Sequence, residues 1–72
     1  MQFKILLAKK LRYNLKSLRI FNNLTQQELA NKVGVSFKTI SHWELGYSEP
    51  SLQLLIKLKN ILNTTFDELL EG

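Results

Sequence analysis

Several side chains of distinct chemistry lie close together in GVSFKTISHWE, residues 34–44. If this segment is a helix, at roughly 100° per residue one arc of roughly 140° holds a set of mixed polar and apolar residues: Phe37, Lys38, Ser41, His42 and Leu45. Lysine and histidine can address guanine N7 and O6, and phenylalanine can contact a thymine methyl group. The arc carries a cation and no acid, so it predicts a helix face suited to the major groove of a DNA duplex.

The opposite side of the same helix suits a protein core. Ile40 and Trp43 lie there, and we expect the indole of Trp43 to be buried rather than stacked on bases. Glu44 falls at the edge of the outer arc. The helix is therefore predicted to be anchored on one side and exposed on the other.

The residues of the outer arc also have plainer interpretations. Lys38 and Ser41 could form an ordinary solvated helix face, and Phe37 could pack locally against Val35. His42 could contact a base, contact a phosphate or lie at the edge of the groove. The position of the helix within the fold has to decide between these alternatives.

This helix is preceded by signals for another helix and a turn. Thr25-Gln26-Gln27-Glu28 is a capping box, in which the Thr25 hydroxyl accepts from the Glu28 amide and the Glu28 carboxylate accepts from the Thr25 amide. Gly34 suits the positive φ that ends a helix, and Ser36 can cap the next helix, from 37 to about 44 or 45. Two short helices joined by so short a turn predict a helix-turn-helix.

Three further helices complete the predicted fold. The first covers about 3–22, with an apolar stripe and an end at Asn22-Asn23; another covers 52–62 after Ser51; and a capping box at 65–68 opens the last. The expected buried side of the 52–62 helix is apolar throughout: Leu52, Leu55, Ile56, Leu58, Ile61 and Leu62. The sequence predicts an all-α, compact five-helix domain over residues 1–72.

Composition argues against an enzyme. The chain of 72 residues has no cysteine and one histidine, so the usual metal sites are not available, and we expect no catalytic residue, cofactor or small-molecule ligand. Ser41 and His42 are neighbours on a helix, so their side chains diverge and cannot pair as nucleophile and base. The opening MQFKILLAKK is too short for a signal or membrane segment, and we expect a cytoplasmic protein.

Charge is distributed unevenly along the chain. Residues 1–42 hold eight basic residues and one acidic residue, a net charge of +7, whereas residues 43–72 hold two basic and five acidic residues, a net charge of −3. A domain polarised in this way can present its basic side to a polyanion, although a solvated lysine-rich helix would give the same count.

Residues 24–70, LTQQELANKVGVSFKTISHWELGYSEPSLQLLIKLKNILNTTFDELL, resemble the phage repressor/Cro-like (Xre-like) helix-turn-helix family. The resemblance runs through the caps, the turn glycine, TIS-W-E and P-S-L, and it suggests a family-like core over about 13–70. It implies a lambda-repressor-like fold and a sequence-specific transcriptional regulator, most often a repressor. Such a protein usually binds a near-palindromic double-stranded DNA operator as a homodimer.

The resemblance also implies roles for individual residues. The base-facing positions, some of which could meet adjacent phosphates instead, are those at the start and on the outer face of the second helix of the motif: Ser36, Phe37, Lys38, Ser41 and His42. Gln26 stands where the family contacts a backbone phosphate, and Arg19 and Glu44 match a pair that ties the first helix to the end of the recognition helix. That pair could be exposed and contribute little, or it could be partly buried next to the DNA backbone, where Arg19 would also meet a phosphate. The family often has basic residues around the glycine after the recognition helix, where this chain has Leu45, Tyr47 and Glu49. A phosphate contact there would use backbone amides and the Tyr47 hydroxyl.

Two questions of assembly remain open at this stage. The same fold could serve as a protein-interaction module, such as an antitoxin or an immunity-type regulator. If the chain forms a homodimer, the last helix with Phe66 and Leu69 is one candidate contact zone, although both residues could simply belong to the core. The N-terminal segment with Ile5, Leu6 and Tyr13 is another.

Overall fold

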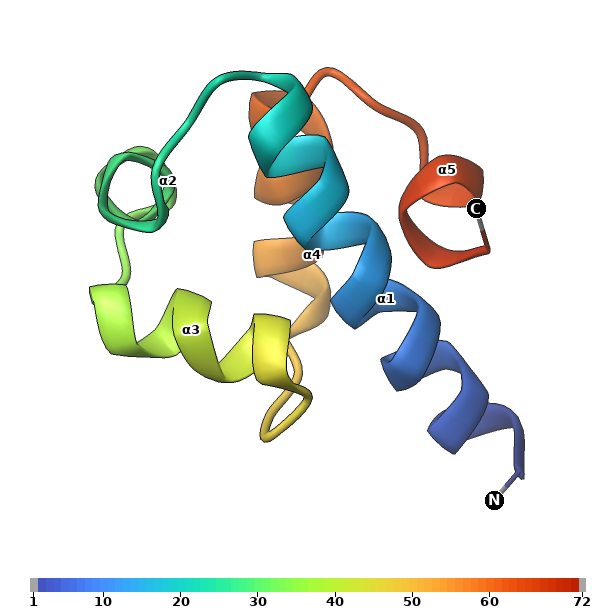
Figure 1. Ribbon diagram of the computed structural model, residues 1–72. Helices are drawn as coiled ribbons and strands as arrows, with labels where there is room; N and C mark the ends of the chain where they lie inside the picture. Colours follow the sequence, from blue (N-terminus) through green and yellow to red (C-terminus); the bar gives the residue numbers. More distant parts are fainter. Residues whose placement is uncertain (1, 72) are drawn as a thin grey trace.

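The computed structural model describes the backbone of residues 2–71 and the side chains of residues 10–71. Its elements are α1 (Gln2–Phe21), α2 (Gln26–Val33), α3 (Phe37–Leu45), α4 (Leu52–Ile61) and α5 (Phe66–Leu70). The helix α1 crosses the middle of the molecule, with α2 and α3 on one side, α5 on the other and α4 behind (Figure 1). The predicted all-α, five-helix fold is confirmed.

Local signals define the ends of the helices as predicted. Both capping boxes form: the Thr25 hydroxyl accepts from the Glu28 amide at 3.0 Å, and the Thr65 hydroxyl accepts from the Glu68 amide at 3.1 Å. Gly34 ends α2 with φ of +88°, a conformation that costs other residues free energy because of their Cβ atom. Because the three residues 34–36 separate α2 from α3, the two helices form a helix-turn-helix.

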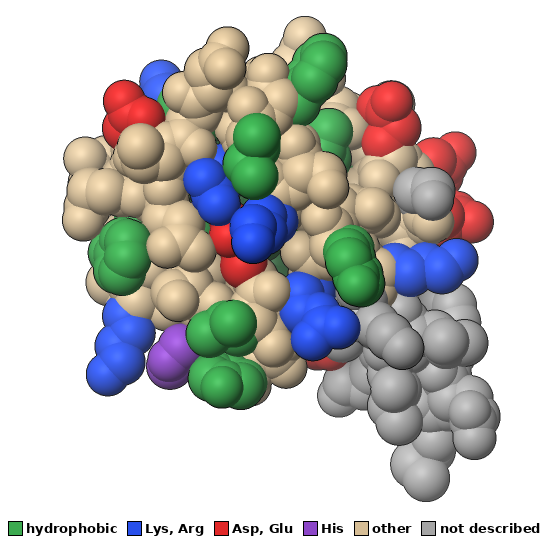
Figure 2. Space-filling view, viewed as in Figure 1, with side chains coloured by type: hydrophobic (Ala, Val, Ile, Leu, Met, Phe, Trp, Pro, Cys, Tyr) green, Lys and Arg blue, Asp and Glu red, His purple; other side chains and the backbone are tan. Residues whose placement is uncertain are grey.

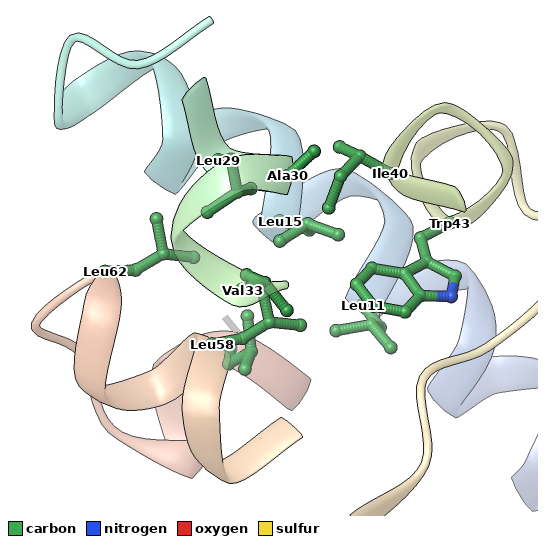
Figure 3. Close-up of a cluster of buried hydrophobic side chains, with 10 residues drawn as sticks. Leu11, Leu15, Leu29, Ala30, Val33, Ile40, Trp43, Leu58 and Leu62 are labelled. Carbon is green, nitrogen blue, oxygen red and sulfur yellow. The ribbon is translucent and has the colours of Figure 1, made fainter. Parts of the chain in front are cut away.

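A continuous hydrophobic core joins α1 to every other helix. Its members are fully or almost fully buried: Leu11, Leu15, Leu29, Ala30, Val33, Ile40, Trp43, Leu58, Leu62 and Leu69. Leu15 lies in the middle of this cluster, and the indole of Trp43 lies beside Leu11 (Figure 3). Burying a side chain such as Leu15 contributes about 1.5–3 kcal/mol, so these contacts hold α3 firmly against the domain.

One expectation about burial was wrong, and one open alternative is settled. Leu52 and Ile56 on α4 are 65% and 42% exposed, because α4 packs through Leu58 and leaves their side uncovered. For Leu69 the second alternative, a core residue, is correct, because it is fully buried in its own chain and so is unavailable to a second copy. The other candidate on α5, Phe66, is 37% exposed and lies beneath the Lys59 ammonium. Ile5 and Leu6 lie outside the residues whose side chains are described.

Candidate nucleic-acid interface

The two sides of α3 differ as the sequence predicted. Ile40 is fully buried and Trp43 is 4% exposed, so both anchor the helix in the core. On the outer side, Phe37 is 49% exposed and Lys38 is exposed, while Ser41 and His42 are half-buried. The outer arc is thus a solvent-facing surface of apolar, cationic and hydrogen-bonding side chains on a rigid helix.

The N-terminus of α3 begins at Ser36, whose hydroxyl is already used within the chain. It accepts from the Thr39 amide at 3.1 Å and lies 2.9 Å from the Thr39 hydroxyl. Ser36 is nevertheless exposed, and a hydroxyl has one donor and two acceptor positions. Capping therefore leaves Ser36 able to make a further contact at the start of the outer arc.

Glu44 connects α3 to both preceding helices through hydrogen bonds. Arg19 of α1 donates through Nε to Oε2 at 2.6 Å and through Nη2 to Oε1 at 3.1 Å, and Gln26 Nε2 donates to Oε1 at 3.0 Å. The side chains of Arg19 and Glu44 are only 11% and 4% exposed. This buried network fixes the end of α3 relative to α1 and to the start of α2.

The network also changes what Arg19 can offer to a ligand. Its Nη1 donates to the Leu24 carbonyl at 2.8 Å, so each of its three nitrogens has a partner within the chain. Its charge is compensated by Glu44 at close range, and a guanidinium has five N–H donors in all. Arg19 mainly holds α1 against the end of α3 through these hydrogen bonds. Only its two remaining N–H groups are available for a phosphate.

Gln26 is half-buried at the first position of α2, with one N–H of its amide directed to Glu44. The amide has a second N–H and an oxygen, and the helix N-terminus adds backbone N–H groups with a partial positive charge. These groups are of the kind that binds phosphate oxygen. The network holds Gln26 in a defined orientation for such a contact.

The segment after α3 brings Tyr47 back against α3. The Tyr47 amide donates to the His42 carbonyl at 2.9 Å, and the two rings meet edge to face with centroids 5.6 Å apart. Tyr47 is 73% exposed, so its hydroxyl is available beside the imidazole. The sequence did not predict this ring contact, through which His42 and Tyr47 lie side by side on the surface.

Two side chains that the sequence analysis did not single out support the helix-turn-helix from outside it. Lys57 of α4 donates to the Val33 carbonyl at the end of α2 at 3.0 Å, and Arg12 of α1 lies within 3.5 Å of the Leu45 carbonyl at the end of α3. Cations are favourable at helix C-termini. Sequence separations of 24 and 33 residues leave no local signal by which either contact could have been found.

The face that carries α3 is rich in basic groups. Figure 2 shows Lys and Arg side chains (blue) over α1 in the middle of this face, with the single histidine (purple) and hydrophobic side chains (green) nearby at α3. Within the described residues, no group of three or more His, Cys, Asp and Glu side chains could hold a metal ion. None of the described helices is long and apolar enough to cross a membrane.

Comparison with known proteins agrees with this geometry. A family model described as Helix-turn-helix matches residues 15–69. The uncharacterized HTH-type transcriptional regulator YqaE of Bacillus subtilis (strain 168) is 42% identical over 59 residues, which are 82% of this chain and 51% of YqaE. The HTH-type transcriptional activator BcrR of Enterococcus faecalis is 41% identical over 58 residues, which are 81% of this chain and 28% of BcrR.

An archaeal relative is similar over most of its length. The uncharacterized HTH-type transcriptional regulator MJ0272 of Methanocaldococcus jannaschii is 40% identical over 55 residues, which are 76% of this chain and 83% of MJ0272. The chain thus spans about half of YqaE and less than a third of BcrR, but most of MJ0272. No solved structure gives a significant match.

Proposed function

Because the chain belongs to the Cro/C1-type (Xre-like) helix-turn-helix family of transcriptional regulators, we propose that it binds double-stranded DNA sequence-specifically through α3 and regulates transcription. The observation that carries the proposal is the outer arc of α3, exposed on a helix whose other side is buried and whose end is fixed by Arg19 and Glu44. A rigid helix with an acid-free outer arc fits the major groove, which is about 12 Å wide.

The proposed reading residues are the N-cap Ser36 and the members of the outer arc other than Leu45: Phe37, Lys38, Ser41 and His42. Lys38 is a donor for guanine N7 and O6, and the Phe37 ring is a contact for a thymine methyl group. Ser41 and His42 are half-buried, so the base pairs that they meet must come close to the helix. Each well-placed contact of this kind gives about 1–3 kcal/mol of discrimination against a wrong base.

The positioning residues contact the phosphate backbone on either side of that groove. Gln26 offers an amide N–H and a helix N-terminus, Tyr47 offers its hydroxyl, and Arg19 offers the N–H groups that Glu44 and Leu24 leave free. These contacts orient the domain but carry no sequence information of their own.

We further propose that the chain acts as a homodimeric repressor on a near-palindromic operator. A bound domain can repress by occupying a promoter, whereas activation requires an additional contact with the transcription machinery. The name of BcrR assigns activation to that relative, so a reporter with the operator placed over or upstream of the promoter has to decide between the two. Two half-sites read by a dimer should lie about 34 Å apart, one turn of DNA.

Selection of binding sites from random duplexes tests the proposal directly. A recurring motif with two-fold symmetry, bound at least about 10³-fold more tightly than unrelated duplexes, is expected. Sedimentation with and without the selected duplex then gives the oligomeric state. Absence of any enriched motif, with no duplex bound even at low salt, would instead favour the protein-interaction module, for which the exposed Leu52 and Ile56 on α4 offer an apolar surface.

A further inference from the structure

A shallow groove of about 520 Å³ lies between α1 and the end of α3, next to the outer arc. Arg12, Lys16 and Glu44 are its charged lining residues, and Tyr13, Ile20 and Leu45 are its apolar ones. The groove is continuous with the recognition surface because Leu45, at its edge, also belongs to the outer arc of α3. Glu44, which also accepts from Gln26 Nε2 at 3.0 Å, links the groove to the start of α2.

The cations of this groove are free to meet an anion from outside. Among the described side chains, the ion pair within 4.0 Å joins Arg19 to Glu44, which leaves Arg12 and Lys16 without a carboxylate partner. Glu44 does not offset them, because Arg19 already compensates its charge. Lys16 is exposed and Arg12 is half-buried, and the lining residues Arg12, Lys16 and Glu44 together carry a net charge of +1.

The Arg12 side chain lies against the main chain at the C-terminal end of α3. A Cβ on Gly46 would lie 3.1 Å from Arg12 Cδ and 3.5 Å from Nη1, so the guanidinium stem crosses directly over this glycine. Its contact with the Leu45 carbonyl, at 3.5 Å, is long, and most of its five N–H donors remain free. The loop 46–49 has no cation of its own and carries Glu49.

From these observations we infer that Arg12 and Lys16 form a second phosphate clamp, which binds the DNA backbone beside the C-terminal end of α3. The inference rests on the proposed function, because a helix seated in the major groove is flanked by a phosphate strand on each side. Gln26 offers a neutral phosphate contact at the start of α2, next to Glu44. The cations Arg12 and Lys16 of α1 lie beside the end of α3, where the loop 46–49 has no basic residue of its own. Tyr13, Ile20 and Leu45 give the groove an apolar floor against which a sugar can pack.

The decisive variant is Lys16→Gln, because Lys16 is exposed and its loss removes one charge from the groove. Each phosphate neutralised contributes about 0.9 to the slope of log Kd against log salt concentration. The slope should therefore become shallower by about 0.9, and the ratio of Kd values at 200 and 50 mM salt should fall about 3.5-fold. Arg12→Gln should have a similar effect, while the ranking of single-base operator variants stays the same because phosphates carry no sequence information.

Lys59→Gln is the matched control, since Lys59 lies over the Phe66 ring away from the groove. It loses the same charge and should leave the salt slope unchanged. Replacing single operator phosphates by neutral methylphosphonates should then identify one position per half-site that weakens the wild-type chain but not Lys16→Gln. Far-UV circular dichroism and the thermal midpoint confirm that each variant is folded.

The outcomes separate this inference from the proposed function. A wild-type chain that binds no duplex selectively overturns both. A chain that binds its selected site normally, with salt slopes for Lys16→Gln and Arg12→Gln equal to that of Lys59→Gln, overturns the clamp alone.

Discussion

Arg19 and Glu44 lie 25 positions apart in the sequence and form a two-pronged, buried ion pair that joins α1 to the end of α3. Their side chains are 11% and 4% exposed, and Gln26 adds a third contact to the same carboxylate. The pair therefore couples the stability of the domain to the placement of α3. Glu44, which periodicity alone places at the edge of the outer arc, is the residue through which α3 is bonded to α1 and α2.

Removing one member of this pair should destabilise the domain strongly. Arg19→Met leaves the Glu44 carboxylate buried with only Gln26 as a partner, and we expect a loss of about 3–5 kcal/mol in the free energy of unfolding. The double variant Arg19→Met/Glu44→Leu buries no unpaired charge and should be more stable than either single variant. Urea denaturation of the three variants measures this, and simple additivity of the two single losses would contradict the coupling.

Substitutions on α3 should change which bases are preferred, whereas a substitution at the start of α2 should weaken binding to all duplexes alike. Lys38→Ala should weaken binding to the selected site by about 1–3 kcal/mol and relax selectivity at one base pair. Gln26→Ala should weaken specific and unrelated duplexes about equally, with little change in salt dependence, because a neutral side chain releases no counterions. Titration against single-base variants of the site distinguishes the two. If Lys38→Ala retained full selectivity and Gln26→Ala lost it, the assignment of α3 as the reading helix would be wrong.

The stability cost of substituting Gly34, in the turn between α2 and α3, should come from its backbone conformation rather than from steric contacts of the new side chain. At Gly34, with φ of +88°, an added Cβ would find its nearest neighbour, Lys57 Nζ, at 3.8 Å, an ordinary contact distance. Gly34→Ala should nevertheless cost about 1–2 kcal/mol of stability because of the left-handed conformation. Gly34→Asn should cost less, since asparagine tolerates this region and already occupies it at Asn23 and Asn63. Thermal denaturation compares the variants, and equal losses would point to a steric origin instead.

The capping box of α2 should make part of the stability dependent on pH. The Thr25 backbone amide and then its hydroxyl hold the pKa of the exposed Glu28 carboxyl below its ordinary value of 4.5. A group whose pKa is lower in the folded state adds stability above its unfolded pKa, and this stability is lost as pH falls through the folded pKa. Glu28→Gln keeps the capping geometry and should flatten the profile of unfolding free energy between pH 6 and pH 3, as measured by urea denaturation. A profile identical to that of the wild-type chain would refute this assignment.

Local sequence determined the helices and their ends, because these depend on residues within one turn of each other. Thr25 and Glu28 form a capping box wherever α2 lies, Gly34 can adopt a positive φ in any context, and Ile40 and Trp43 must share the side opposite Phe37 and Lys38. The helix-turn-helix and the outer arc of α3 follow from such spacing alone. The same spacing puts Leu11 and Leu15, four residues apart, on the apolar stripe of α1, and both are buried.

Tertiary structure decided everything that depends on how much of each helix is covered and by which neighbour. Periodicity places Leu52 and Ile56 on one side of α4, but it cannot say that no helix packs against them, and both are exposed. Nor can it indicate that Arg12 crosses Gly46 or that Lys57 reaches the Val33 carbonyl, because these contacts join residues 24 or more positions apart. Such contacts arise only when the core brings α1 and α4 against the ends of the helix-turn-helix. The contact made by α1 places the Arg12 guanidinium beside the end of α3.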